Sequence, residues 1–305
     1  MTMASKESQR VNRYWEATLL PPQPDSLVTN DHWEILTREP RGVDYLEVEA
    51  GGVPALWDLP HGLKDDAPVL LCIHGGGYLG GSMFTHRKMF AHLAKAIGAR
   101  ALVIDYTLLP AGGAYPVPIT EGLAAYRWLL DQGIASERIG FVGDSAGGSL
   151  AMTVQLRARS EGLPLPAATM LMSPWNDFAG IGESLVTNEG KDVLFTKEWI
   201  SQMAAAFLNG HDPYDSDTMP LYADLRGFGP ICIQVGDQEL LLDDSRLLAN
   251  HAREAGVDVQ LEEFPDQQHS FQMAAGFAPE ADQAIEGLAA WGRPLLHDEE
   301  VPNKS

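Results

Sequence analysis

Ser145 lies between two glycines in the stretch GDSAGG. Gly143 is two residues before it and Gly147 is two residues after it, which gives a Gly-x-Ser-x-Gly spacing. A nucleophilic serine held on a sharp strand-to-helix turn needs small neighbours, because the strand and the helix approach each other closely there. The spacing therefore predicts a serine nucleophile, although the same letters also occur in ordinary glycine-rich loops.

A serine hydroxyl needs a base, a group that orients the base, and donors that stabilise a developing oxyanion. The stretch HGGGY (74–78) offers such donors, since successive glycines expose their backbone N–H groups. We expect the N–H groups of Gly75 and Gly76, together with that of Ala146 at the start of the helix after Ser145, to form an oxyanion hole. A phosphate-binding loop is excluded, because no Gly-Lys-Ser/Thr follows.

The candidate base is a histidine on a loop after the last predicted strand. His269, in FPDQQHSF, is the one of the nine histidines that has this position. His251 falls within a predicted helix, His211 in an irregular segment and His297 near the C-terminus. His74 precedes the glycines of HGGGY, where we expect a structural ring. The sequence therefore favours His269 as the base that takes the serine proton.

The acid that orients the base is harder to assign. Four carboxylates follow the apolar run PICIQV: Asp237, Glu239, Asp243 and Asp244. Asp243 and Asp244 suit the N-cap and the first turn of the next helix. The residues alone leave Glu239 and Asp237 open.

The elements that must position these residues alternate along the chain. Continuous apolar runs predict strands buried on both faces, at 67–74, 99–106, 137–144, 167–174, 230–237 and 257–265. Amphipathic segments predict helices at 85–98, 120–133, 145–162, 243–256 and 279–293. Strand–helix alternation predicts an α/β fold with a doubly wound, mostly parallel sheet.

This alternation is interrupted between residues 178 and 226, where KEWISQMAAAFLNG predicts a helix in loop-like sequence. An insertion at the carboxyl edge of a parallel sheet lies where such folds bind ligands. We expect residues 1–40 and 178–226 to form a cap, 41–177 and 227–298 to form the catalytic core, and 299–305 to be a tail.

Composition limits the partners and the compartment. The chain has 42 acidic and 21 basic residues, for a net charge of -21, so nucleic acid and anionic membranes are not expected partners. Cys72 and Cys232 lie in apolar runs and are predicted to be buried free thiols, which suits a reducing compartment. No leader-like or membrane-spanning apolar run is present, and we expect a cytoplasmic protein.

Several stretches resemble the bacterial hormone-sensitive-lipase-like esterases (family IV) of the α/β-hydrolase fold. They are HGGGY, DYTLLPAGGAYPVP, GDSAGGSLA, SPWNDF, PLYADL and HSF, in order and spacing over roughly residues 67–275. In that family the acid appears as Asp-x-x-x-Asp about thirty residues before the histidine. ELLLD (239–243) occupies this register, so the resemblance implies Glu239 as the acid, in place of the commoner aspartate.

The leading hypothesis is a serine carboxylesterase with Ser145, Glu239 and His269 as its catalytic triad. The resemblance implies short- to medium-chain ester substrates, with lactones left open, and a homodimer. It implies neither a metal nor a cofactor. The alternatives are a non-catalytic small-molecule receptor on the same fold and an acyltransferase. Fold alone does not decide among them.

Overall fold

The computed structural model describes residues 4–19, 33–216 and 219–297. Its strands are β1 (Val43–Ala50), β2 (Val53–Pro60), β3 (Val69–Ile73), β4 (Arg100–Ile104), β5 (Ile139–Asp144), β6 (Ala168–Met172), β7 (Ile231–Gly236) and β8 (Val259–Phe264). Within these residues they form one eight-stranded sheet of order β1-β2-β4-β3-β5-β6-β7-β8. Strands β3 to β8 are parallel, whereas β1 and β2 are antiparallel to their neighbours.

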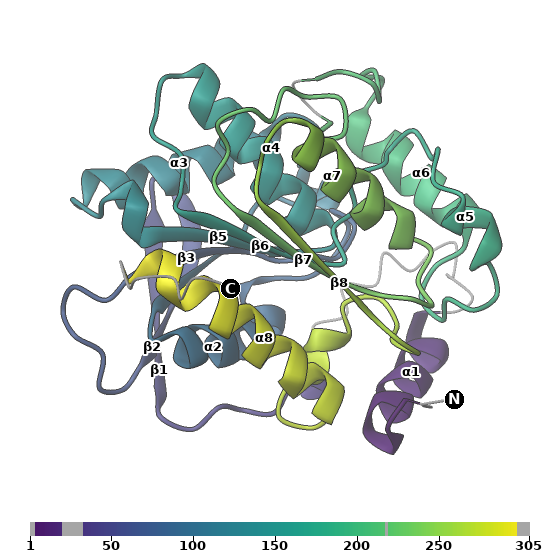
Figure 1. The fold of residues 1–305 in the computed structure, drawn as a ribbon, viewed down its shortest axis with the longest axis horizontal. Helices are drawn as coiled ribbons and strands as arrows, with labels where there is room; N and C mark the ends of the chain where they lie inside the picture. The colour runs from purple at the N-terminus through teal and green to yellow at the C-terminus, as the bar shows by residue number, and fades with distance from the viewer. Residues whose placement is uncertain (1–3, 20–32, 217–218, 298–305) are drawn as a thin grey trace.

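Helices cover both faces of the sheet (Figure 1). They are α1 (Lys6–Leu19), α2 (Met83–Ile97), α3 (Val117–Asp131), α4 (Ala146–Ser160), α5 (Ser184–Thr187), α6 (Lys197–Leu208), α7 (Leu242–Glu254) and α8 (Pro279–Leu296). Figure 1 shows α2 and α8 on one face and α3, α4 and α7 on the other. This arrangement confirms the predicted doubly wound, mostly parallel sheet.

The central strands are apolar throughout because both of their faces are buried. In β3 the side chains of Val69, Leu71 and Ile73 pack into the core layer that contains α3 and α4. Those of Leu70 and Cys72 point the other way, into the layer that contains α2 and α8. Successive side chains of a strand face opposite sides, so a strand covered on both sides has no polar alternation.

The antiparallel hairpin β1–β2 was not predicted from the sequence. Strand β1 is the edge of the sheet, and most of its side chains are exposed or half-buried. Its sequence, VDYLEVEA, therefore lacks the continuous apolar run that identified the other strands. Gly51 and Gly52 link the two strands and both have positive φ angles, 64° and 89°, which glycine adopts readily.

The N-terminal helix is attached to the C-terminal part of the core. The N–H and Oγ of Ser5 donate to the carboxylate of Glu280, at 2.6 and 2.7 Å. The Oγ of Ser8 donates to Gln267, two residues before His269, at 3.2 Å. Helix α1 is thus fixed to the start of α8 and to the loop of the candidate base. Part of the predicted cap (1–3, 20–32 and 217–218) and the predicted tail (299–305) lie outside the described residues.

Cys72 and Cys232 are buried free thiols, as predicted. Across residues 4–19, 33–216 and 219–297, no helix is both long and apolar enough to cross a membrane.

Candidate active site

Ser145 lies on a strained turn at the carboxyl end of β5. Strand β5 ends at Asp144 and helix α4 begins at Ala146, so Ser145 alone makes the turn, with φ 52° and ψ -125°. A positive φ is costly for a residue with a side chain, and it persists only where the surroundings fix it. Here the N–H of Ser145 donates to the carbonyl oxygen of Met172 at 2.9 Å, and its own carbonyl accepts from Trp175 at 3.0 Å.

Glycines of the Gly-x-Ser-x-Gly and HGGGY stretches let the segments around this turn approach one another closely. A Cβ on Gly147 would lie 2.1 Å from the carbonyl oxygen of Ile73, at the end of β3. A Cβ on Gly75 would lie 2.9 Å from the Cβ of Ser145. The HGGGY loop is therefore packed directly against the candidate nucleophile, which only residues without a side chain permit.

His269 and Glu239 form a buried hydrogen-bonded pair. The Nδ1 of His269 lies 2.7 Å from the Oε2 of Glu239, and the two side chains are 3% and 0% exposed. The Oε1 of Glu239 accepts from the N–H of Gly236 at 2.7 Å and from the Oγ of Ser173 at 2.8 Å. With Nδ1 donating to a carboxylate, the other nitrogen of the ring is left to accept a proton. That Nε2 has no hydrogen-bond partner among the described residues.

The pair lies beside the serine turn. The Oγ of Ser270, next to His269, donates to the Oδ2 of Asp144, next to Ser145, at 3.0 Å. Asp144 thereby joins the base loop to the turn that holds the nucleophile. Asp144 had no predicted role, although it directly precedes the candidate nucleophile in the sequence.

Burial and neighbouring charges act in opposite directions on the pKa of His269. Burial alone would lower the pKa of the imidazole, but the charge and hydrogen bond of Glu239 raise it, and the charges of Asp192 and Asp144 add to this. The net result is a pKa above the ordinary histidine value. Imidazolium is thus stabilised where a general base would form it.

Asp237 has a different set of partners. Its Oδ1 accepts from the N–H of Asp266 at 2.8 Å and from the Nε2 of Gln238 at 2.7 Å. These bonds close the turn after β8 and do not involve the imidazole of His269. Of the two carboxylates left open by the sequence, Glu239 is the one against the ring.

The other two carboxylates of the acid loop do not cap the helix. The N-cap of α7 is Leu241, so the predicted N-cap role of Asp243 or Asp244 is wrong, although both lie in the first turn as expected. Asp243 instead accepts from the N–H of Ser184 at 2.8 Å, and Asp244 accepts from two backbone N–H groups after β6 at 2.7 Å. Asp244 thus ties α7 to the segment directly after β6, and Asp243 ties it to the inserted segment. Both carboxylates satisfy backbone donors that would otherwise be unpaired.

The predicted oxyanion donors fall into two groups. The N–H of Gly75 donates to the Oδ1 of Asp144 at 2.9 Å, so the expectation that it is a free donor must be corrected. The carboxylate of Asp144 is buried and no longer hydrated, so it requires hydrogen-bond donors from the protein. Within the described residues, no hydrogen bond engages the N–H groups of Gly76, Gly77 and Ala146. Gly77 was not singled out from the sequence.

Two buried histidines support this loop. His74 contacts the carbonyl oxygen of Gly75 through Nδ1 at 2.8 Å and stacks on Tyr106, with ring centroids 4.3 Å apart. Burial, and then the charge of His86, lower the pKa of His74 to about 3. The ring is therefore neutral at pH 7 and shapes the loop. His86 lies 3.5 Å from Asp144, and its charge helps to lower the pKa of that carboxyl against the opposing effect of burial.

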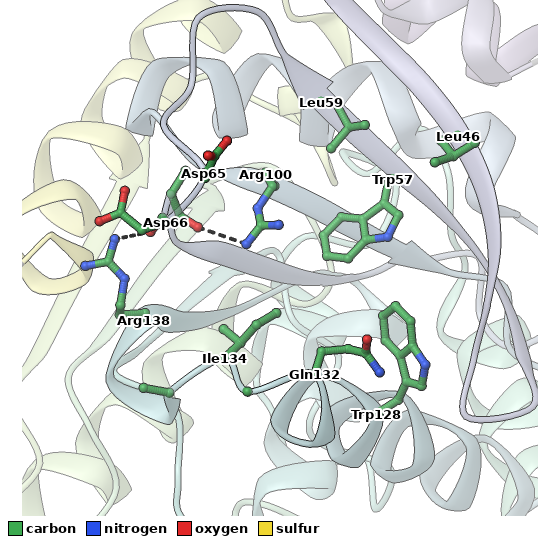
Figure 2. A pocket seen from close by; sticks show the side chains of 13 residues that line it. Leu46, Trp57, Leu59, Asp65, Asp66, Arg100, Trp128, Gln132, Ile134 and Arg138 are labelled. Atoms are coloured by element: carbon green, nitrogen blue, oxygen red, sulfur yellow. Dashed lines mark hydrogen bonds between the residues drawn. The ribbon is translucent and has the colours of Figure 1, made fainter.

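A groove of about 640 Å³ lies at the opposite end of the sheet (Figure 2). Figure 2 shows Trp57, Trp128 and Arg100 among the side chains that line it. Arg100 begins β4, whereas Ser145 follows the end of the parallel strand β5. The groove is thus at the amino ends of the strands and is not the candidate active site, since ligands of such sheets bind at the carboxyl ends.

In the part of the chain that the structure describes, no group of three or more His, Cys, Asp or Glu side chains is arranged to hold a metal ion. The sequence-based expectation of no cofactor stays a prediction.

Comparison with known proteins places the chain in a family. Residues 70–273 match the family of the α/β-hydrolase fold. An acetyl-hydrolase from Streptomyces hygroscopicus is 37% identical over 81% of each chain. An esterase from Acinetobacter venetianus is 35% identical over 73% of this chain and 74% of its own. The crystal structure of an esterase from the bacterial hormone-sensitive lipase family has a TM-score of 0.90, with 40% identity, and covers 97% of this chain and 100% of its own.

The chain is therefore an α/β hydrolase. It belongs to the bacterial hormone-sensitive-lipase-like esterases of that fold, and it is a carboxylic ester hydrolase. The resemblance noted in the sequence motifs is thereby confirmed.

Proposed function

We propose that the chain hydrolyses short- to medium-chain carboxylic esters through a covalent acyl-enzyme on Ser145. The observation that carries the proposal is the buried His269–Glu239 pair, held beside a strained serine turn through the Ser270–Asp144 hydrogen bond. A nucleophile, a base and an orienting acid at the ends of different strands are the elements of a serine hydrolase.

In the first half of the reaction, the Oγ of Ser145 attacks the ester carbonyl carbon and its proton passes to the Nε2 of His269. Glu239 stabilises the imidazolium that forms and keeps Nδ1 protonated. The N–H groups of Gly76, Gly77 and Ala146 donate to the oxyanion, and the position of Ala146 at the N-terminus of α4 favours the negative charge.

The second half releases the product. Collapse of the tetrahedral intermediate breaks the bond to the alcohol oxygen, which takes the proton from His269. Water then attacks the acyl carbon and gives a proton to His269. The bond between the acyl carbon and the Oγ of Ser145 breaks, His269 returns the proton to that oxygen, and the carboxylic acid is released. The same attack would open a lactone, in which the alcohol and the acid belong to one molecule.

The inserted segment supports a short acyl group. The ring of Phe207, on α6, stacks on Tyr78 with centroids 3.7 Å apart. A Cβ on Gly77 would lie 2.7 Å from the Sδ of Met203, also on α6. Helix α6 thus packs against the HGGGY loop, whose N–H groups would bind the carbonyl oxygen of the ester. This packing restricts the space beside the loop. We infer that residues 178–226, together with residues 1–40, act as a cap over the active site. The homodimer and the cytoplasmic location stay predictions.

Hydrolysis of p-nitrophenyl esters from acetate to palmitate tests the proposed substrate class. We expect the highest kcat/KM at acetate to hexanoate and a steep fall for longer chains. A profile that rises to palmitate would contradict the short-chain proposal, and an inactive wild type would contradict the proposed reaction. Addition of an alcohol during turnover, with analysis of the products, distinguishes hydrolysis from acyl transfer.

A further inference from the structure

The inserted segment 188–195 contacts the loop that carries Glu239. The Nδ2 of Asn188 donates to the carbonyl oxygen of Asp237 at 3.0 Å and to that of Glu239 at 2.9 Å. Its Oδ1 accepts from the Nζ of Lys191 at 2.9 Å, which is consistent with the orientation of the amide. One buried side chain therefore holds the backbone of the acid loop at Glu239 itself and two residues before it.

Asp192 holds the same loop from the other side of Glu239. Its Oδ2 accepts from the N–H of Leu240 at 2.8 Å, and its Oδ1 accepts from the N–H groups of Leu194 and Phe195 at 2.7 and 2.9 Å. Asp192 is only 6% exposed. Three donors converge on it, which a carboxylate can satisfy and an amide cannot, because one end of an amide is itself a donor.

The loop of the base is docked on this segment as well. The Oε1 of Gln268 accepts from the N–H of Val193 at 3.0 Å, and its Nε2 donates to the carbonyl oxygen of Lys191 at 2.8 Å. The ring of Phe195 meets that of His269 edge to face, with centroids 4.9 Å apart. The segment thus touches both partners of the His269–Glu239 pair.

Three carboxylates from three different elements raise the pKa of His269 through their negative charge. They are Glu239 on the acid loop, Asp192 on the inserted segment and Asp144 at the end of β5. Burial raises the pKa of Asp192, while its backbone donors and the charge of His269 oppose this. Lys191, the cation of the segment 188–195, donates to the Oδ1 of Asn188. Removal of the Asp192 charge would therefore make imidazolium less stable and lower the pKa of His269.

We propose that Asp192 and Asn188 are positioning residues for ester hydrolysis, which hold the Glu239 loop against His269 from the inserted segment. This inference rests on the proposed triad. Neither side chain touches the reacting atoms in the mechanism above. Their effect is expected in kcat, because a small displacement of a catalytic pair costs more in the transition state than in substrate binding.

The first test compares Asp192→Asn with Glu189→Gln, which removes an exposed carboxylate from the same segment. For Asp192→Asn we expect kcat to fall about 10- to 100-fold, with KM changed by less than about threefold. The acid limb of its pH–rate profile should also move to lower pH. Glu189→Gln should match the wild type in both respects. A folded Asp192→Asn variant with wild-type kcat and an unshifted acid limb would overturn the inference.

A second variant, Asn188→Ala, keeps the test decisive if Asp192→Asn fails to fold. It removes two donors from the acid loop and no charge, so we expect kcat to fall with a smaller shift of the acid limb than in Asp192→Asn. A folded Asn188→Ala variant with wild-type kcat would overturn the inference. Wild type and Ser145→Ala belong in the same assay: an inactive wild type would refute the proposed function itself, whereas active wild type with unaffected variants would refute only the positioning role.

Discussion

Charged side chains are partly or fully buried at both ends of the sheet, but their partners differ. At the carboxyl end, Asp144 and Glu239 each accept hydrogen bonds from a backbone N–H and a serine hydroxyl, and each also approaches a histidine. At the amino end, Arg100 and Arg138 donate to backbone carbonyl oxygens, and the guanidinium of Arg100 lies 5.5 Å from the centre of the Trp57 ring (Figure 2).

This difference shows which end of the molecule is built for chemistry. The groove at the amino end has a volume of about 640 Å³. Its two arginines, Arg100 and Arg138, have no carboxylate within 4.0 Å in the described part of the chain. At the carboxyl end, the carboxylates of Asp144 and Glu239 are each fixed by several hydrogen bonds. Fixed dipoles and titratable pairs, and not the size of a cavity, are what proton transfer requires.

The largest effect should come from Ser145→Ala, which removes the nucleophile at the carboxyl end. We expect kcat for p-nitrophenyl acetate to fall by at least about a thousandfold, because neither the base nor the oxyanion donors can replace the attacking oxygen. Ser160→Ala, at the exposed end of α4, is the matched control and should keep wild-type activity. Substantial turnover by Ser145→Ala would remove the serine from the account.

Glu239→Gln should have the next largest effect. The amide keeps the size of the side chain but does not stabilise imidazolium, so kcat should fall by about 100- to 10,000-fold. Asp237→Asn, two residues away, should change kcat by less than about threefold because its partners are Asp266 and Gln238. Steady-state kinetics of the two variants decide between the carboxylates, and a greater loss in Asp237→Asn would reassign the acid.

The pH dependence of kcat/KM should report His269. Because Glu239, Asp192 and Asp144 raise the pKa of the imidazole above the ordinary value of about 6.5, activity should be lost as the pH falls through that raised pKa. A protonated ring cannot accept the serine proton. The pH–rate profile of Glu239→Gln should have its acid limb at lower pH. An acid limb well below pH 6 in the wild type would contradict this electrostatic description.

The smallest effect is expected at the amino end. Arg138→Gln removes the guanidinium that donates to the carbonyl oxygen of Asp66, so it should lower the free energy of unfolding by about 1 kcal/mol. Its kcat and KM for p-nitrophenyl acetate should stay within about twofold of wild type, since exposed-edge substitutions far from a site rarely change catalysis. A larger change in kcat would show that the two ends are coupled.

Local patterns were sufficient to predict much of the carboxyl end. The Gly-x-Ser-x-Gly and HGGGY stretches depend on neighbouring residues only, and the buried strands show as continuous apolar runs. Glu239 was reached through the resemblance, at a separation of thirty residues from His269. The rest depends on contacts between distant segments. The Gly75–Asp144 bond joins residues 69 apart and the Asp192–Leu240 bond joins residues 48 apart, and no local pattern signals either.

The most direct test of the central claim is to identify the acyl-enzyme. Wild type mixed with p-nitrophenyl acetate and quenched in acid during the first turnovers should gain the mass of one acetyl group, carried by the peptide that contains Ser145. Ser145→Ala should gain none. An acetyl group on another residue, or turnover without any acylated protein while Ser145→Ala stays active, would contradict nucleophilic catalysis by Ser145.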